Sequence, residues 1–255
     1  MNKRLRHYID LILVLTDKEM KLRYKSSILG YLWSIGHPLA LALVFFVAFK
    51  VVMKIQMDNY ALFLICGLFP WQWFQNSVTV SPTLFLNNAS IIKKVNFPRN
   101  IIPFVSVLQD MIHFILSILV IAGLMFAYHK MPSAAWIYGI PFLLLVQFMT
   151  AYGVSMFIAS INLFFRDLER LTTIFMTLLF YFTPVIYPVS MVPDKYKFYV
   201  NLNPLGPLMI SWRGLFLDGK LELQTVCFAL LYAVIFYALG SFVYRRLSVR
   251  FGEIL

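Results

Sequence analysis

One acidic residue lies inside a long apolar run and is the first candidate for chemistry. Asp110 has Gln109 beside it and His113 three residues further on, on the same face of a helix. An ionisable pair is costly to bury in hydrocarbon, and an acid with an imidazole could relay protons. A polar contact between two helices is the commoner use of such side chains. The sequence therefore favours a helix contact at Asp110 and leaves a proton relay open.

A second charged group stands at the start of another apolar run. Residues 166–170 read Arg-Asp-Leu-Glu-Arg, and their charges are spaced for i,i+3 and i,i+4 pairing on a helix. Such a group can neutralise itself at the beginning of a helix. Its guanidinium groups, Arg166 and Arg170, could instead take part in gating or bind a phosphate headgroup.

Catalytic and cofactor motifs are weak. Residues 214–221 match the GxxxxGK part of a phosphate loop, but Leu221 stands where Ser or Thr must bind magnesium, and no predicted strand precedes them. The two cysteines, Cys66 and Cys227, lie in apolar runs and indicate no disulfide framework or metal site. We expect no catalytic residue, no metal and no cofactor in this chain.

The elements that position these residues are expected to be membrane helices. The chain has 255 residues, 61% hydrophobic and 13% charged, with a mean hydropathy of +0.78, which excludes a soluble domain and a disordered chain. Six apolar runs are long enough to cross about 30 Å of hydrocarbon: residues 29–53, 60–82, 101–128, 134–162, 171–189 and 224–244. We therefore expect an all-α integral membrane protein with six transmembrane helices.

The basic residues indicate the orientation. The formal net charge is +11, from 22 Lys and Arg against 11 Asp and Glu. With six spans, 15 of the 22 basic residues lie in segments on the side of the two termini, and seven lie on the other side. Cytoplasmic loops carry the excess of Lys and Arg, so both termini are expected in the cytoplasm. Topology thus explains the charge without a nucleic-acid partner.

Two predicted cytoplasmic segments lie outside the spans. Residues 1–26 form an amphipathic pattern, with apolar side chains on one stripe and Asp and Lys on a neighbouring arc. Such a helix lies in the membrane interface, where it anchors the chain or meets a cytoplasmic partner. Residues 83–100 are the longest cytoplasmic connection and predict a short helix that ends before Pro98.

The segment between the fifth and sixth spans, residues 190–223, is irregular. Its Pro and Gly at 203–207 prevent a continuous helix. Irregular backbone at membrane depth needs protein or a water-filled cavity to satisfy its polar groups. We expect two short re-entrant helices that dip into the outer leaflet. An ordinary external loop with an interfacial helix is the alternative.

Aromatic residues make up 17% of the chain. Four of them could line a passage, because aromatic faces stack on sugar rings as well as they pack in cores: Tyr152, Tyr181, Phe182 and Tyr187. Contact with lipid or with other helices is the alternative for each.

Several blocks, collinear over nearly the whole chain, resemble one known family. Residues 23–38 read RYKSSILGYLWSIGHP, which is similar to the entry into the first span of ABC-2 type polysaccharide exporter permeases. The further blocks are residues 67–74, 92–99, 162–170, 183–187 and 203–205. The likeness is greatest to O-antigen (lipopolysaccharide) export permeases. Teichoic-acid exporter permeases are similar, and capsule permeases fit less well.

The resemblance implies partners as well as a function. Members are homodimers that bind two copies of a separate cytoplasmic ATPase, which carries ATP and magnesium. Residues 1–255 would be a single transmembrane domain, with 190–223 as a periplasmic gate. The substrate would be an undecaprenyl-diphosphate-linked polysaccharide that crosses the bacterial inner membrane. A membrane enzyme acting on polyprenyl phosphates and a proton-coupled transporter remain alternatives of other classes.

The resemblance also implies three groups of site residues. The N-terminal helix and a short helix at 87–97 would contact the ATPase through Lys18, Lys21, Asn87, Asn88, Ile91, Lys93, Lys94 and Phe97. A diphosphate headgroup favours cationic donors where the path meets the cytoplasmic leaflet, here Arg23, Lys25, Arg166 and Arg170. The four aromatic residues named above would line the translocation path.

Overall fold

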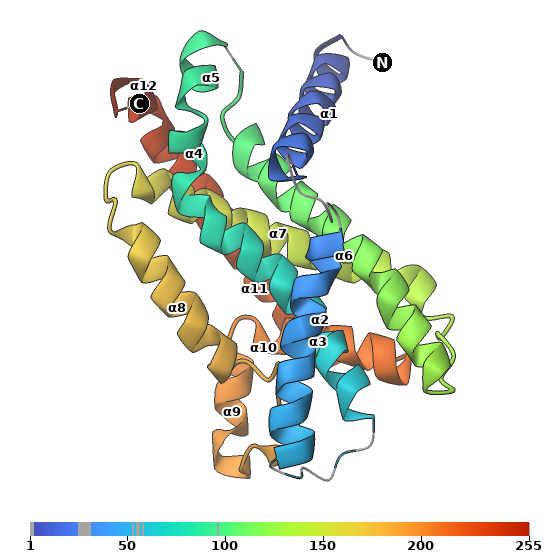
Figure 1. Ribbon diagram of the computed structural model, residues 1–255. Coiled ribbons are helices and arrows are strands. Elements are labelled where there is room, and N and C mark those ends of the chain that lie inside the picture. The colour runs from blue at the N-terminus through green and yellow to red at the C-terminus, as the bar shows by residue number, and fades with distance from the viewer. Residues whose placement is uncertain are drawn as a thin grey trace.

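The computed structural model describes residues 3–24, 32–52, 54, 57, 59–95 and 97–254, and every regular element in this part of the chain is helical (Figure 1). The α-helices are α1 (Lys3–Tyr24), α2 (Leu32–Phe46), α3 (Tyr60–Val80), α4 (Leu84–Asn87), α5 (Ala89–Lys94), α6 (Ile101–Ala127), α7 (Trp136–Asn162), α8 (Leu168–Phe182), α9 (Asp194–Leu202), α10 (Gly206–Arg213), α11 (Leu223–Leu247) and α12 (Phe251–Ile254). Short turns of other helix types join them: η1 (Val47–Val52), η2 (Ser81–Thr83), η3 (Val189–Met191), η4 (Gly214–Asp218) and η5 (Ser248–Arg250).

Three of the described helices are long and apolar enough to cross a membrane. They are α6 and α7, with 27 residues each, and a 28-residue stretch from Leu223 to Arg250 that contains α11. At 1.5 Å per residue, each reaches about 40 Å. The other three predicted spans correspond to shorter helices: α2 with η1, α3 and α8. The all-helical membrane fold is confirmed at this coarser level.

Helix α3 forms the centre of the molecule. Leu62, Leu64, Leu68 and Trp71 are fully buried, as befits a helix that is hydrophobic on all sides. Pro70 lies inside α3 and leaves one helical hydrogen bond unmade.

A polar bridge ties this central helix to its neighbours. The side-chain amide of Gln147 on α7 donates to the carbonyl oxygen of Pro70 over 2.7 Å. The indole of Trp212 on α10 donates to the amide oxygen of Gln147 over 2.6 Å. The bridge thus connects α3, α7 and α10 inside the core, where each of these polar groups needs a partner.

Helices α7 and α11 approach each other closely at two glycines. A Cβ on Gly240 would lie 2.1 Å from the carbonyl oxygen of Gly153, and a Cβ on Gly153 would lie 2.5 Å from the backbone of Phe236. Small residues allow such backbone contact between membrane helices, where van der Waals packing drives association.

Both ends of the chain lie at the same end of the molecule. In Figure 1 this is the upper end, which also holds α1, α4, α5 and α12, while α9 lies at the lower end. An even number of crossings produces this arrangement, so it accords with the six predicted spans.

Candidate functional site

The connection between α3 and α6 is anchored on a small apolar cluster of its own. The buried members are Leu84, Phe85, Ile92, Phe97, Ile102, Ala159, Leu163 and Phe251. Instead of one helix at 87–97, the chain forms α4 and α5, and Val95 is extended. Phe97 is only 9% exposed, and Ile91 is half-buried against the same cluster. These two residues, which were predicted to contact the ATPase, instead pack in the apolar cluster and hold the connection in place.

The outer side of the same connection is polar. Asn87, Lys93 and Lys94 are exposed. The Asn87 amide donates to the Thr83 hydroxyl oxygen over 3.2 Å, and the Asn88 amide donates to the Leu84 carbonyl oxygen over 3.0 Å. These bonds stabilise the chain where α4 ends and α5 begins. Lys93 and Lys94 at the end of α5 are exposed to solvent.

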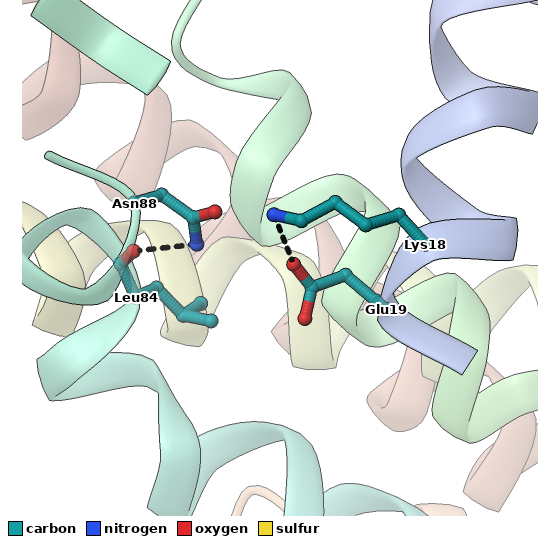
Figure 2. Close-up of polar contacts among 4 residues, drawn as sticks. All are labelled: Lys18, Glu19, Leu84 and Asn88. Carbon is teal, nitrogen blue, oxygen red and sulfur yellow. Dashed lines mark hydrogen bonds and ion pairs between the residues drawn. The ribbon is translucent and has the colours of Figure 1, made fainter. Parts of the chain in front are cut away.

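Helix α1 faces this connection across a small cavity. Figure 2 shows the Lys18 side chain extending from α1 toward Asn88, with the Lys18 ammonium 3.3 Å from the Glu19 carboxylate. Glu19 and Asn88 line the same cavity, which has a volume of about 250 Å³. Leu15 packs α1 onto α6 through Ile101 and Val105.

The second predicted lysine of α1 belongs to the same arrangement. Lys21 forms an exposed i,i+4 ion pair with Asp17 at 2.6 Å. The structure thus gathers the predicted contact residues of α1, α4 and α5 at one end of the molecule.

The predicted headgroup residues are only partly described. Lys25 lies outside the described residues, and so does the side chain of Arg23, although its backbone belongs to α1. Arg166 and Arg170 are exposed where α8 begins. Among the described residues, neither takes part in an ion pair, so their guanidinium groups are open to an anionic partner.

Helix α8 has two different faces. The inner face borders an apolar cavity of about 400 Å³ that is also lined by residues of α3, α7 and α11, while Phe180 of α8 packs directly on Trp71 of α3. Its members on α8 are Leu168, Leu171, Thr172, Phe175, Met176 and Leu179. The opposite face carries a polar stripe at i, i+3, i+7 and i+11, formed by Arg170, Thr173, Thr177 and Tyr181, which are all exposed.

Three of the four predicted path aromatics meet at the end of α8. Tyr181 and Phe182 are 59% and 71% exposed, and the Tyr187 hydroxyl donates to the Tyr181 carbonyl oxygen over 3.2 Å. Tyr152 lies elsewhere. It is buried, donates to the Asn100 carbonyl oxygen over 3.2 Å, and packs edge-to-face on Phe104.

Asp110 joins α6 to α3. It is 2% exposed and accepts a hydrogen bond of 2.8 Å from the Ser77 hydroxyl. The Ser155 hydroxyl of α7 donates to the Ser77 carbonyl oxygen over 3.1 Å, so three helices meet at this point. His113 is buried nearby on α6. This geometry supports the interpretation of Asp110 as a helix contact.

Arg213, one of the seven basic residues predicted on the external side, is buried and binds backbone carbonyls. It is 7% exposed, its guanidinium lies over the Phe63 ring at 3.7 Å, and it donates to the carbonyl oxygens of Phe63, Pro184 and Val185. A Cβ on Gly67 would collide with this guanidinium. The available signal was an arginine in the apolar run 208–217, where an ionisable residue has a role by default.

The irregular segment after α8 is tied down by side chains. The Tyr60 hydroxyl donates to the Ile186 carbonyl oxygen over 2.8 Å. The Asn203 amide donates to the Phe182 carbonyl oxygen and the Thr183 hydroxyl over 3.1 and 2.9 Å. Two short helices, α9 and α10, lie within residues 190–223, and their re-entrant course stays a prediction. At the exposed start of α9, a 2.6 Å contact with the Lys197 ammonium lowers the pKa of the Asp194 carboxyl.

Comparison with known proteins gives one consistent result. The family model described as "ABC-2 type transporter" matches residues 10–217. Two proteins named "O-antigen export system permease protein RfbA", both from Klebsiella pneumoniae, are 43% identical over 255 residues, which covers 100% of this chain and 98% of theirs. A protein of the same name from Myxococcus xanthus is 32% identical over 222 residues, covering 86% of this chain and 85% of its own.

Proposed function

The chain belongs to the ABC-2 type transporter family, and from this premise we propose that it is the membrane subunit of an ATP-driven O-antigen exporter. The observation that carries the proposal is the 43% identity to O-antigen export permeases over the whole chain. All three relatives carry that name, which favours O-antigen over teichoic acid or capsule. The protein is a transport subunit and not an enzyme. Its substrate is the polysaccharide on undecaprenyl diphosphate.

The proposed topology has six spans, namely α2 with η1, α3, α6, α7, α8 and α11, in one domain over residues 1–255. Both termini lie in the cytoplasm of a bacterium, and the protein sits in the inner membrane. The position of both chain ends at one end of the molecule supports this assignment, as does the excess of basic residues there. Helices α9 and α10 then form a re-entrant gate on the periplasmic side.

The energy comes from a partner. Two copies of the chain form a homodimer, and each copy binds one cytoplasmic ATPase, which holds ATP and magnesium. The contact surface on this chain is the end that carries α1, α4 and α5, with the exposed ammonium groups of Lys93 and Lys94 and the exposed amide of Asn87 outermost. The apolar cluster beneath them also contains Ile102 of α6 and Ala159 of α7, so a displacement of α4 and α5 by the ATPase is transmitted to α6 and α7.

The polysaccharide passes the polar face of α8. Arg166 and Arg170, with Arg23 and Lys25, engage the diphosphate on the cytoplasmic side, because guanidinium groups bind phosphate oxygens in bidentate geometry. Thr173, Thr177 and Tyr181 then offer oxygens to sugar hydroxyls. Tyr181, Phe182 and Tyr187 provide rings for stacking at the outer end. Tyr152 was predicted to join them, and its burial in the core favours a structural role instead.

Complementation tests the proposal. In a strain that lacks its own O-antigen permease but makes the lipid-linked polymer, this chain with its cognate ATPase should restore polysaccharide to the cell surface. The matched control is the same pair with the ATPase's phosphate-loop lysine replaced, which should leave the polymer inside. Surface polymer in the control strain, or none with the intact pair at normal expression, would contradict the proposed function.

A further inference from the structure

An open cavity of about 490 Å³ lies between the outer end of α8 and α9. Four aromatic side chains line it, from Phe182, Tyr187, Tyr196 and Tyr199, and Asn203 contributes an amide. Its remaining lining residues are aliphatic, so none of the nine carries a charge. The cavity is thus aromatic and neutral, with a few hydroxyl and amide groups.

The rings are exposed although they are large. Phe182 is 71% exposed, Tyr199 63% and Tyr196 48%, and the Tyr196 and Tyr199 rings lie 6.4 Å apart. Aromatic rings at the end of a membrane helix commonly form an interfacial belt, but here they also surround a hollow that is large enough for a sugar ring. A ligand that covers these rings would remove apolar surface from water.

The frame behind the rings is fixed by hydrogen bonds. The Tyr187 hydroxyl is bound to the backbone of Tyr181, and the Asn203 amide is bound to the backbone of Phe182. The Asn203 side-chain oxygen accepts from the Leu205 backbone over 3.0 Å. These bonds hold the end of α8 and the end of α9 at a set separation, so the cavity exists before any ligand arrives.

We propose that this cavity is a saccharide subsite that holds sugar residues of the exported glycan after they pass around the outer end of α8. Leu179 and Phe182, which line it, lie on the opposite side of α8 from the polar stripe, so the glycan reaches the cavity only past the last turn of the helix. The proposal rests on the proposed function and deepens it, because it assigns Tyr196 and Tyr199 of α9 to the substrate. A sugar ring has an apolar face of C–H groups that stacks on an aromatic ring and a rim of hydroxyls that needs polar partners. The neutral lining suits a neutral sugar and not the diphosphate, whose cationic donors lie on the cytoplasmic side.

Charged groups near the cavity stay at its rim. The Lys195 ammonium lies 4.6 Å from the centre of the Tyr196 ring, and Lys197 pairs with Asp194. Neither lysine is among the lining residues. A saccharide in the cavity therefore contacts aromatic rings and no charged group. Because no charge lines the cavity, we expect its binding to depend only weakly on salt.

Crosslinking during export is the direct test. A photoreactive residue is placed at position 196 or 199, and at 138 as the matched control, because Tyr138 on α7 is also 63% exposed but does not line the cavity. We expect polysaccharide adducts at 196 and 199 and none at 138. Adducts of phospholipid alone at 196 and 199, or equal polymer labelling at 138, would overturn the subsite.

Binding to the purified permease–ATPase complex in nanodiscs gives a second test. The probe is the lipid-free oligosaccharide released by mild acid from the strain's own polymer, followed by saturation-transfer NMR. Tyr196→Leu with Tyr199→Leu should weaken binding about tenfold, since two stacking contacts are lost, whereas the double Phe variant should stay within about twofold. Tyr138→Leu should bind like the parent. Parental affinity in the double Leu variant, with the ATPase still attached, would reject the assignment.

The two levels of failure are distinguishable. If export proceeds without this chain, the proposed function fails. If export requires the chain but positions 196 and 199 never contact the polymer, only the saccharide subsite fails.

Discussion

At the scale of single residues, Arg213 links α10 to α3 and to the segment after α8. Its guanidinium binds backbone carbonyls of α3 and of the segment after α8, where the chain is not helical and its carbonyl groups have no helical partner. Gly67 leaves the space that the guanidinium occupies. One side chain thus satisfies several buried acceptors at once, which apolar residues of similar size cannot do.

Replacing Arg213 by Met is expected to destabilise the protein by about 3 kcal/mol, because each buried carbonyl left without a donor costs roughly 1–3 kcal/mol. The apparent Tm of the purified chain should fall by roughly 5 °C or more, measured by thermal unfolding in detergent. Lys220→Met removes the same charge from an exposed site and serves as the control. An unchanged Tm for Arg213→Met would show that its hydrogen bonds are dispensable.

Asp110 gives a prediction about energy coupling. Because the Asp110 carboxyl oxygen accepts from Ser77, Asp110→Asn keeps an oxygen for this hydrogen bond and removes the group that could titrate. Export should continue at close to the parental rate, measured as surface polysaccharide over time. Asp110→Leu, which removes the acceptor, should impair folding instead. Complete loss of export in the Asn variant at normal expression would favour the proton relay.

At the scale of elements, the connection formed by α4 and α5 has one side that packs on an apolar cluster and one side that is exposed and polar. The sequence alone placed Ile91 and Phe97 among the contact residues, yet both pack on the apolar cluster below. Phe97→Asp would bury a charge in that cluster and disturb the local fold, so it cannot report on the ATPase contact by itself. Substitution of the exposed Lys93 and Lys94 can test this contact, because neither side chain is part of the buried cluster.

Charge reversal on α5, by Lys93→Glu with Lys94→Glu, should release the ATPase and leave the permease folded. Exposed charges set partner choice more than stability, so the thermal transition should stay within a few degrees while co-purification of the ATPase is lost. Lys130→Glu changes a charge away from this end and is the control. Full ATPase recovery with the double variant would remove α5 from the interface.

The two faces of α8 predict different surroundings. In a Cys227→Ser background, Cys at position 173 or 177 should react with a membrane-impermeant thiol reagent, because the proposed function places the exposed polar stripe in a water-filled path. Cys at 175, on the apolar cavity side, should react only with a lipid-soluble reagent. Cys66 is buried and remains as the internal background. Equal protection at 173, 175 and 177, or disulfides between subunits at 173, would place this face elsewhere.

At the scale of the whole molecule, most of the fold could be predicted because hydrophobic length is a local property. The predicted runs at 60–82, 101–128 and 134–162 agree with α3, α6 and α7 to within two residues at each end. The run at 171–189 was placed too late and too long. Thr183 is extended because Pro184 follows it, which ends α8 at Phe182.

The sites were harder to predict because they depend on contacts between distant segments. The docking of Arg213 on α3 requires α10 to fold back across 150 residues of sequence. The separation of Tyr152 from Tyr181 likewise depends on how α7 packs, since both are tyrosines in apolar runs. Composition and hydrophobic periodicity predict neither the docking of Arg213 nor the separation of the two tyrosines.

The global topology is open to a direct test. Reporter fusions that are active only outside the cytoplasm should be inactive after residue 97 and after residue 254, and active after residue 130. The reason is that the excess of basic residues lies on the side of α1, α5 and α12. Activity after residue 97 would invert the orientation and move the proposed ATPase surface to the wrong side.

The apolar hollow behind α8 has a mechanical consequence. The backbones of α7 and α11 are in contact at Gly153 and Gly240, so these two helices cannot move closer together. The cavity of about 400 Å³ between α8 and these two helices leaves α8 room to move toward them. Movement of α8 into this cavity leaves no buried polar group without a partner, because its inner stripe is apolar apart from Thr172, whose hydroxyl is already bonded within the helix. Under the proposed function, this movement of a single helix widens the path along the polar face of α8.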